Sequence, residues 1–370
     1  MKQPIKKLDE LFMMECIALA EKGGGYVSPN PMVGAVLVKR GKVIGRGYHK
    51  HFGDSHAEVN AIRSAKQSVR GATLYVNLEP CNYFGKTPPC TDLIIKSGIS
   101  EIIIGSKDPN PIVRGKGIQQ LRKAGIKVEV GVLENECKKL NESFEKYITK
   151  GLPFVTLKIA QTLDGKIAYK KGNSKWITNP TSRKLIHHFR SRYDAVLVGA
   201  RTVIKDNPKL TVRDVEGRSP LRIVIDGDFK VDPKSNIFIP SEVKTILFIS
   251  IKAVRTNSKK KSILTKNGVE IIELEPKRNG FISLNEVLQM LAARGIASVL
   301  VEGGAQIFSS FIQEQLVDKL LVFIAPKIFG KGLNSFEYLQ DKSLEKYIQL
   351  RDVSIMNLDN DLLIEAYIKK

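Results

Sequence analysis

The chain has 370 residues, more than one hydrophobic core usually organises, so we expect two domains of ordinary size. Hydrophobic residues make up 42% and charged residues 26%, and no window offers the roughly 18 to 20 uncharged apolar residues of a membrane span. The net charge is +21, but the lysines are scattered, and we interpret the one tight run, 259–261, as a solvated loop rather than a nucleic-acid-binding arm. We therefore expect a globular protein with no nucleic acid and no membrane as partner.

The N-terminal part alternates between short strands and helices. Its first 23 residues have apolar positions every three or four residues with acids among them, which favours a cytoplasmic helix over a signal peptide. Strands are predicted over 33–38, 42–47, 73–78, 101–105 and 127–131. Helices are predicted from His56, from Pro89, over 117–124 and over 133–147. This alternation is typical of an α/β layered domain.

A domain boundary is predicted at 149–153, where Gly151 and Pro153 stop a helix, giving domains of 1–150 and 151–370. The second domain also has an α/β pattern, with a turn at Asp164 and Gly165. Its predicted strands are 154–160, 195–199, 221–226, 244–249, 268–273, 298–302, 319–325 and 362–368. Its predicted helices are 180–192, 283–293 and 305–314.

Three side chains that can bind a metal follow one another in the first domain: His56, Cys81 and Cys90. One imidazole and two thiolates leave the fourth position of a tetrahedral Zn²⁺ to a water, whose pKa the metal lowers, as in catalytic zinc sites. Glu58 is the predicted proton shuttle between this water and a departing amine. Both cysteines are expected where a strand or loop leads into a helix, whose positive end favours the thiolate. The pattern predicts a zinc-dependent deaminase.

Other interpretations of the cysteines and histidines remain open. The two ligand cysteines of base deaminases are separated by two residues, whereas eight lie between Cys81 and Cys90. A fourth ligand, His49 or His51, would make the zinc structural and leave Glu58 without a role. The remaining cysteines, at 16 and 137, have no partner at ligand spacing, and we expect them to be packing residues.

Six segments resemble the bifunctional pyrimidine deaminase and reductase of riboflavin biosynthesis. They are SPNPMVGAVLV (28–38), HAEVNAI (56–62), NLEPCNYFGKTPPC (77–90), DPNP (108–111), VTLKIAQTLDGKIA (155–168) and SKWIT (174–178). The longer cysteine spacing and TLDGKIA do not belong to nucleoside or transfer-RNA deaminases. The resemblance implies a cytidine-deaminase-like three-layer domain followed by a dihydrofolate-reductase-like domain.

The same resemblance implies the two reactions. The first domain removes an amino group from a 2,5-diamino-6-(phosphoribosylamino)pyrimidinone with Zn²⁺, and the second reduces the ribosyl unit of the product to ribityl with NADPH. We also expect a homo-oligomer, a dimer or a tetramer, in the cytoplasm. Two other hypotheses are a base or nucleoside deaminase with an accessory domain and an RNA-binding or regulatory protein with structural zinc.

Position by position, the resemblance implies that Asn30, His49 and Lys86 contact the deaminase substrate. From the residues alone, a turn residue is the alternative for Asn30, a surface histidine is an equal alternative for His49, and a solvated loop residue is the usual interpretation for Lys86. The family commonly has a histidine two places after the first ligand cysteine, where this chain has Tyr83.

In the second domain, no G-x-G-x-x-G follows a strand, which argues against a Rossmann site. Gly303 and Gly304 lie between a predicted strand and a predicted helix, where backbone N–H groups can hold a pyrophosphate, although such pairs are more often tight turns. The resemblance implies cofactor contacts from Ala160, Trp176, Thr202, Asp206, Gly304, Ala305, Gln306, Ile307, Phe308, Ser309 and Ser310.

The implied substrate contacts of the reductase include two arginines, whose planar donors can bind phosphate bidentately. The implied set is Ser174, Arg190, Leu210, Arg213 and Glu302. Without the resemblance, the two arginines would be surface residues and Trp176 a core aromatic. Lys158 and Asp164 position the sugar or assist proton transfer in one interpretation, and are a strand-end charge and a turn in the other. The sequence singles out no general acid.

Overall fold

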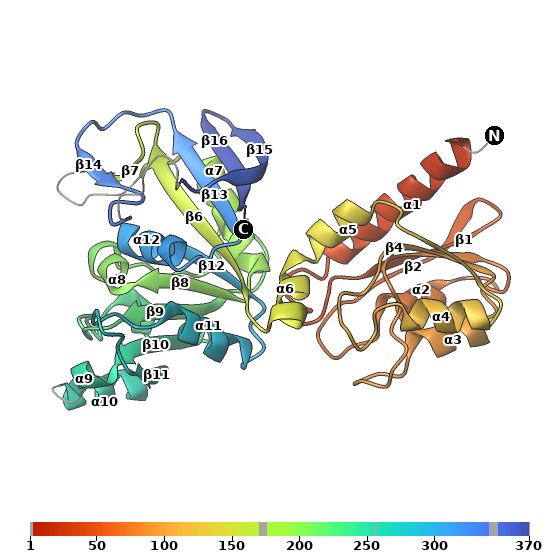
Figure 1. Ribbon diagram of the computed structural model, residues 1–370, viewed down its shortest axis with the longest axis horizontal. Helices are drawn as coiled ribbons and strands as arrows, with labels where there is room; N and C mark the ends of the chain where they lie inside the picture. Colours follow the sequence, from red (N-terminus) through yellow and green to blue (C-terminus); the bar gives the residue numbers. More distant parts are fainter. Residues whose placement is uncertain (1–2, 170–175, 255–256, 340–346, 370) are drawn as a thin grey trace. The chain divides into compact units, whose positions relative to one another are not determined.

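The structure, a computed structural model, describes residues 3–169, 176–254, 257–339 and 347–369 (Figure 1). The chain divides into two compact units, Met1–Leu152 and Pro153–Lys370, and the described strands of the first form one sheet of their own. Within the described residues, no helix has the length and apolar character needed to cross a membrane.

The N-terminal unit is built on a five-stranded sheet in the order β2-β1-β3-β4-β5. Its strands are β1 Gly34–Lys39, β2 Lys42–Tyr48, β3 Thr73–Leu78, β4 Glu101–Ser106 and β5 Lys127–Val130. Strand β1 runs antiparallel to β2 and β3, whereas β3, β4 and β5 are parallel. Its helices are α1 Gln3–Glu21, α2 Ala57–Ser64, α3 Cys90–Lys96, α4 Lys116–Lys123, α5 Glu134–Leu140 and α6 Glu142–Lys150.

Both faces of this sheet are buried under helices, because successive side chains of a strand point to opposite faces. Leu74 and Val76 of β3 join the cluster packed with α2, α3 and α4, while Tyr75 joins the cluster packed with α1 and α5. Cys16 and Cys137 lie fully buried in the second cluster, which confirms them as packing residues. The unit is therefore a three-layer α/β domain, as predicted.

Two glycines of β2 set the position of α2, the helix that carries Glu58. A Cβ atom at Gly45 would lie 2.4 Å from the Ala61 carbonyl oxygen, and one at Gly47 would lie 2.2 Å from the Ala61 nitrogen. Only a strand without side chains at these positions lets the helix backbone come so close.

The single helix predicted over 133–147 is wrong, because the structure has two helices, α5 and α6, that meet at Asn141. The Asn141 side chain accepts from the Met32 N–H at 2.8 Å and donates to the Met32 carbonyl at 2.9 Å. A side-chain amide that forms hydrogen bonds with a distant backbone N–H and carbonyl favours a local conformation in which the helix is interrupted. The sequence of 133–147 alone does not indicate that Asn141 binds the backbone of Met32.

The C-terminal unit has a nine-stranded sheet in the order β11-β10-β9-β8-β12-β6-β13-β16-β15. The strands from β11 to β13 are parallel, and β16 and β15 add an antiparallel edge. The strands are β6 Phe154–Thr162, β8 Ala195–Gly199, β9 Leu221–Asp226, β10 Thr245–Ser250, β11 Val269–Leu274, β12 Ser298–Gly303, β13 Lys319–Ala325, β15 Leu350–Leu358 and β16 Asp361–Ile368. Strands β7 Lys166–Tyr169 and β14 Gly332–Asn334 pair separately (Figure 1).

The helices of this unit connect the parallel strands. They are α7 Pro180–Arg192, α8 Ala200–Asp206, α9 Ile251–Val254, α10 Ser258–Lys266, α11 Leu284–Ala292 and α12 Ala305–Gln313, with a 3₁₀ turn η1 at Asn236–Phe238. Helices α8 and α12 begin directly after β8 and β12, which are neighbours in the sheet. Their first turns therefore meet at the carboxyl ends of parallel strands, where ligands of open α/β sheets bind.

The interpretation of 259–261 as a solvated loop is wrong, because these lysines lie in α10. Lys260 Nζ donates to the Phe229 carbonyl at 2.6 Å, and Lys261 Nζ pairs with Glu273 at 2.6 Å. The aliphatic part of a lysine side chain can cover apolar surface while its ammonium group reaches a polar partner. A run of lysines can therefore form part of a helix that packs on a sheet. Strands β7, β14 and β15 and helices α8 and α9 are further elements that the sequence pattern does not predict.

Candidate active sites

Three metal-binding atoms converge in the N-terminal unit. His56 precedes the first turn of α2, Cys81 follows β3, and Cys90 is the first residue of α3. His56 Nδ1 lies 3.2 Å from Cys90 Sγ and 3.5 Å from Cys81 Sγ. A tetrahedral zinc with bonds of about 2.1 Å to nitrogen and about 2.3 Å to sulfur would hold such atoms about 3.6 Å apart. The donor set and its spacing fit zinc.

Neighbouring groups favour the metal-binding form of Cys81 and orient the ring of His56. Hydrogen bonds from Cys90 and then His56 lower the pKa of the Cys81 thiol, which favours the thiolate that zinc binds. Thr87 Oγ1 lies 3.5 Å from His56 Nε2, the ring nitrogen that does not face the sulfurs. A partner there holds the imidazole with Nδ1 toward the metal position.

Glu58 lies in the first turn of α2 and is 3% exposed. Burial raises the pKa of its carboxyl group, and the charge of His56 opposes this effect. A buried carboxyl group next to a metal site can take up and release a proton near neutral pH, which general acid–base catalysis requires.

The two other candidate ligands do not join this site. His49 is 2% exposed, so the interpretation as a surface histidine is wrong. Its Nε2 lies 3.2 Å from Asn30 Nδ2, and its Nδ1 lies 3.3 Å from the Ser55 carbonyl. His51 is exposed and pairs with Asp54. Among the described residues, the metal-binding cluster consists of His56, Cys81 and Cys90, which leaves a zinc coordination position for a non-protein ligand.

Two of the predicted substrate contacts of the deaminase lie beside the cluster, and the third lies on the loop between its cysteines. The rings of His49 and His56 meet edge to face, with centroids 5.4 Å apart, and Asn30 is hydrogen-bonded to His49. Lys86 is exposed, on the loop between the two ligand cysteines, with Nζ 3.9 Å from the centroid of the Phe52 ring. Tyr83, on the same loop, is 41% exposed.

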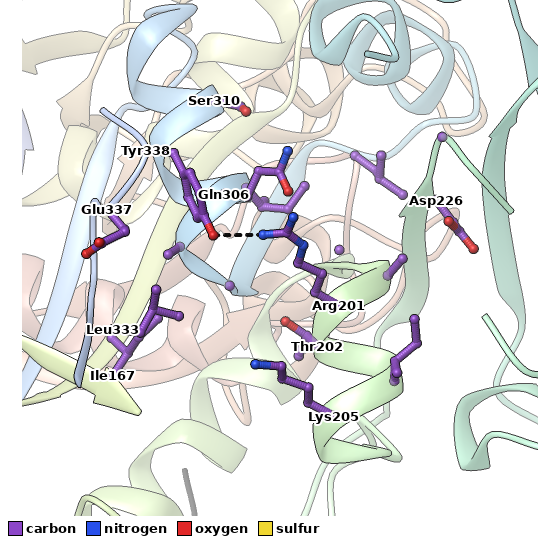
Figure 2. Close-up of a pocket in the computed structure, with 18 of the residues that line it drawn as sticks. Ile167, Arg201, Thr202, Lys205, Asp226, Gln306, Ser310, Leu333, Glu337 and Tyr338 are labelled. Atoms are coloured by element: carbon purple, nitrogen blue, oxygen red, sulfur yellow. Dashed lines mark hydrogen bonds between the residues drawn. The ribbon is translucent and has the colours of Figure 1, made fainter. Parts of the chain in front are cut away.

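A cavity of about 1290 Å³ lies between α8 and α12 in the C-terminal unit (Figure 2). No described side chain caps the start of α12, and a Cβ atom at Gly304 would lie only 3.3 Å from Thr202 Oγ1. Free N–H groups beside a bare backbone suit the phosphates of a dinucleotide. Of the predicted cofactor residues, this cavity is lined by Thr202, Asp206, Gly304, Ala305, Gln306, Ile307 and Ser310.

A second cavity of about 510 Å³ adjoins the first, since both are lined by Ile167, Thr202, Asp206 and Gly304. The second contains most of the predicted substrate residues and the other predicted cofactor residues except one. It is lined by Ala160, Trp176, Arg190, Leu210, Arg213, Glu302 and Phe308, together with Lys158. Ser309 is instead buried and accepts from the Tyr338 N–H at 3.2 Å, while Ser174 lies outside the described residues. Two adjoining cavities can hold two reactants side by side.

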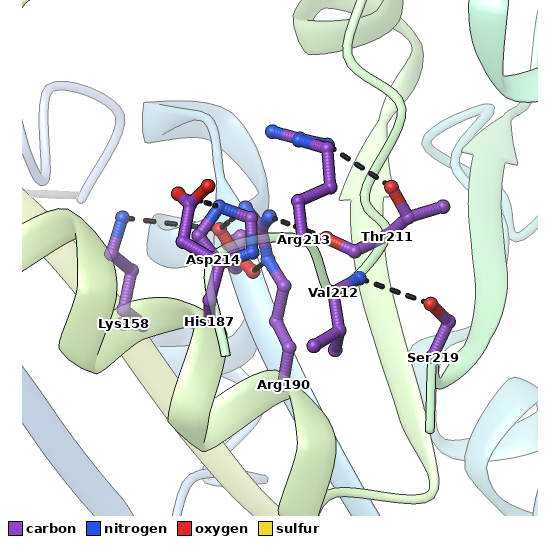
Figure 3. A network of polar contacts seen from close by, with 9 residues as sticks. Lys158, His187, Arg190, Thr211, Val212, Arg213, Asp214 and Ser219 are labelled. Atoms are coloured by element: carbon purple, nitrogen blue, oxygen red, sulfur yellow. Dashed lines mark hydrogen bonds and ion pairs between the residues drawn. The ribbon is translucent and has the colours of Figure 1, made fainter. Parts of the chain in front are cut away.

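A buried ion network forms one wall of the second cavity (Figure 3). Glu302 accepts from Arg190 Nε at 2.5 Å and Nη2 at 2.8 Å, and Lys158 Nζ lies 3.8 Å from Glu302 Oε2. Burial alone would raise the pKa of Glu302, but the charge and hydrogen bonds of Arg190 and the charge of Lys158 hold it at about 2. Burial lowers the pKa of Lys158. The interpretations of Arg190 as a surface residue and Lys158 as a strand-end charge are therefore wrong.

Of the remaining positions, Trp176 differs from the simplest interpretation of the sequence, whereas Arg213 is an exposed surface residue and Asp164 is a turn residue, as that interpretation has them. Trp176 is 65% exposed, so it is not a core aromatic, and the Arg183 guanidinium lies 4.5 Å from its ring centroid. Arg213 donates to Thr211 Oγ1 at 3.0 Å. Asp164 does lie in a turn, where it accepts from Thr162 Oγ1 at 2.6 Å and from the Gly330 N–H at 2.8 Å.

Sequence reasoning missed several cavity residues. Arg201 of α8 and Tyr338, which follows β14, line the first cavity from opposite sides (Figure 2). His187 lines the second, with Nε2 3.3 Å from Asp214 Oδ2. None of them belongs to a motif, and only the fold brings them to the cavities.

Comparisons with known proteins cover both units. Residues 6–106 match the cytidine and deoxycytidylate deaminase zinc-binding region, and residues 153–364 match the RibD C-terminal domain. The riboflavin biosynthesis protein RibD of Aquifex aeolicus is 45% identical over 361 residues, covering 97% of this chain and 98% of that protein. The protein of the same name from Escherichia coli is 36% identical over 366 residues, covering 93% and 96%.

A solved structure is similar over its whole length. The diaminohydroxyphosphoribosylaminopyrimidine deaminase/5-amino-6-(5-phosphoribosylamino)uracil reductase of Thermotoga maritima is 44% identical to this chain. The two structures have a TM-score of 0.86, over 98% of this chain and 99% of that one. The similarity therefore extends across both units.

Proposed function

The chain belongs to the RibD family of riboflavin biosynthesis, and from this membership we propose how its residues divide two reactions. It is a bifunctional enzyme with a zinc-dependent deaminase and an NADPH-dependent reductase. It deaminates 2,5-diamino-6-(5-phosphoribosylamino)pyrimidin-4(3H)-one and reduces the product to 5-amino-6-(5-phosphoribitylamino)uracil. The match of residues 153–364 to the RibD C-terminal domain sets aside the hypotheses of an accessory or RNA-binding domain.

We assign deamination to residues 1–150 and reduction to residues 151–370. The observation that carries the first assignment is the convergence of His56, Cys81 and Cys90 beside the buried Glu58. The observation that supports the second is the pair of adjoining cavities at the carboxyl ends of parallel strands.

In the deaminase, His56 Nδ1 and the thiolates of Cys81 and Cys90 would hold zinc. Bound there, zinc supplies a Lewis acid and lowers the pKa of water. Hydrolytic deamination forms a C–O bond and breaks a C–N bond. Of the two protons of the attacking water, one goes to the leaving nitrogen, which departs as ammonia, and the other goes to the ring nitrogen beside the new carbonyl. We assign the transfer to the leaving nitrogen to Glu58. Asn30, His49 and Lys86 are the proposed substrate contacts.

In the reductase, NADPH supplies the hydride for the anomeric carbon of the sugar. The bond from that carbon to the ring oxygen breaks, and the oxygen gains a proton. We assign this proton to Lys158, whose ammonium lies in the wall of the second cavity with its pKa lowered by burial. Glu302, which Arg190 holds by hydrogen bonds, pairs with Lys158, and Arg213 is the proposed contact of the substrate phosphate.

One assay tests both halves. The purified chain is incubated with the diaminopyrimidine phosphate, with and without NADPH, while ammonia and NADPH absorbance are followed. We expect ammonia in both samples and oxidation of NADPH after deamination. Ammonia without NADPH oxidation would contradict the reductase half, and the absence of both signals would overturn the proposal.

We place both reactions in the cytoplasm. Zinc binding needs Cys81 and Cys90 as free thiolates, and their sulfurs lie within 4.8 Å of each other. Such a pair is prone to oxidation unless a reducing compartment or the metal protects it.

We further propose that the chain forms a homo-oligomer through β15. This strand is the last of the sheet, and its first eight residues are all exposed. They include Val353 at 56%, Ile355 at 67% and Met356 at 54% exposure. An apolar edge strand that is exposed on both faces is a ready template for a second chain.

Replacement of Ile355 by lysine is expected to convert the oligomer to a monomer, because it places a charge in the proposed interface. Size-exclusion chromatography with light scattering measures the change in mass. The matched control is Ile263→Lys, at a residue of α10 that is 49% exposed. An Ile355→Lys chain of unchanged oligomeric mass would contradict the interface.

A further inference from the structure

We propose that Arg201 binds the diphosphate of the dinucleotide cofactor and that Tyr338 positions its guanidinium group. This inference rests on the binding of NADPH in the large cavity. Figure 2 shows Arg201 reaching from α8 toward Gln306 of α12 and toward Tyr338 on the far side. All three residues line the cavity.

A hydrogen bond joins the two walls of the cavity. Arg201 Nη1 donates to the Tyr338 hydroxyl at 2.8 Å, and the guanidinium carbon lies 5.5 Å from the tyrosine ring centroid. Both backbone polar groups of Tyr338 form hydrogen bonds with side chains of α12. Its N–H donates to Ser309 Oγ at 3.2 Å, and its carbonyl accepts from Gln313 Nε2 at 3.1 Å. These contacts fix the position of Tyr338, whose hydroxyl in turn orients the flexible side chain of Arg201.

The charge of Arg201 has no carboxylate partner among the described residues. Most carboxylates that line the cavity are occupied elsewhere. Asp226 accepts from the Val231 N–H at 2.7 Å, and Asp228 pairs with Lys230 at 2.6 Å. Glu314 pairs with Lys277 at 2.8 Å, and Glu337 accepts from Asn334 Nδ2 at 2.7 Å. The neutral Tyr338 hydroxyl orients the guanidinium without neutralising it, which leaves its charge for an anion.

The first turn of α12, on the other wall of the cavity, indicates that the anion is the diphosphate. The uncapped first turn of α12 offers backbone N–H groups, and Gly304 beside it has no side chain. A diphosphate has two adjacent anionic groups, one for the helix start and one for the guanidinium. The diphosphate is common to NADPH and NADH, so the contribution of Arg201 is the same for both.

The test measures dissociation constants of NADPH and NADH for the full chain by calorimetry. The variants are Arg201→Met, Tyr338→Phe, the double variant and the matched control Lys266→Met, at an exposed lysine of α10 outside both cavities. We expect Arg201→Met to weaken both dinucleotides about 20-fold, the range of a charged hydrogen bond. We expect Tyr338→Phe to weaken both about threefold, but to have no further effect in the Arg201→Met background.

The outcomes separate this inference from the proposed function. Unchanged binding by Arg201→Met would overturn it, and so would a loss confined to NADPH, which would place Arg201 at the 2′-phosphate. An additive effect of Tyr338→Phe in the double variant would refute the positioning role, since an indirect effect must vanish when Arg201 is gone. A wild-type chain that binds neither dinucleotide would instead refute the reductase assignment. Thermal unfolding of each variant verifies that it is folded.

Discussion

Replacement of Glu58 by glutamine is expected to slow deamination by about three orders of magnitude while the chain keeps its zinc. Glutamine has nearly the same shape as glutamate, but it cannot take a proton from water and pass it to the leaving amine. Because the three metal ligands are untouched, the metal content should remain that of the wild type. Ammonia release measures the rate, and elemental analysis measures the zinc.

The C-terminal unit provides the control for this variant. Supplied with the deaminated pyrimidine, Glu58→Gln should oxidise NADPH at the wild-type rate. A variant that lost zinc while remaining folded would show Glu58 to be a metal ligand, and the proton-transfer role would then be wrong. A variant that kept both zinc and deamination would exclude any role for Glu58 in proton transfer.

Replacement of Lys158 by methionine is expected to slow the reduction at least about a hundredfold, because it removes the proton donor next to the sugar. Methionine is close to lysine in length, so the wall of the cavity keeps its shape. Glu302 retains both hydrogen bonds from Arg190, so no buried carboxylate loses its only partner. Stopped-flow NADPH absorbance with the deaminated substrate measures the rate.

Lys166→Met is the matched control, because Lys166 lies in β7 and its Nζ donates to Asn334 at 2.5 Å on the surface. We expect this control to reduce the substrate normally. We also expect Lys158→Met to release ammonia at the wild-type rate. If reduction by Lys158→Met matched that of the control, another group would have to protonate the sugar oxygen.

The zinc site could be predicted from the sequence because its chemistry is concentrated in a few adjacent residues. His56 and Glu58 share one helix start, and the spacing of Cys81 and Cys90 requires a loop that returns to the same place. Strand periodicity also predicted the α/β architecture, since Leu74, Tyr75 and Val76 alternate between two cores as the pattern requires.

The buried reductase network could not be predicted from the sequence. Arg190 and Glu302 are separated by 112 residues, and only the adjacency of α7 to the sheet brings them together. Asn141 divides a predicted helix because of Met32, which lies 109 residues away. Likewise, β15 has all of its first eight residues exposed, so its sequence lacks the alternation that identifies a half-buried strand. For Glu302 and for Asn141, the deciding partner is distant in the sequence.

The loop between Cys81 and Cys90 begins and ends at metal ligands, and Thr87 within it lies beside His56. An ion bound at this position would hold both ends of the segment that carries Tyr83 and Lys86. Removal of zinc is therefore expected to stop deamination and to make the peptide bond after Lys86 more susceptible to a trypsin-like protease. Among the described residues, no such metal-binding cluster occurs in the C-terminal unit, so we expect the zinc-free chain to leave the diaminopyrimidine unconverted while it still reduces the deaminated product.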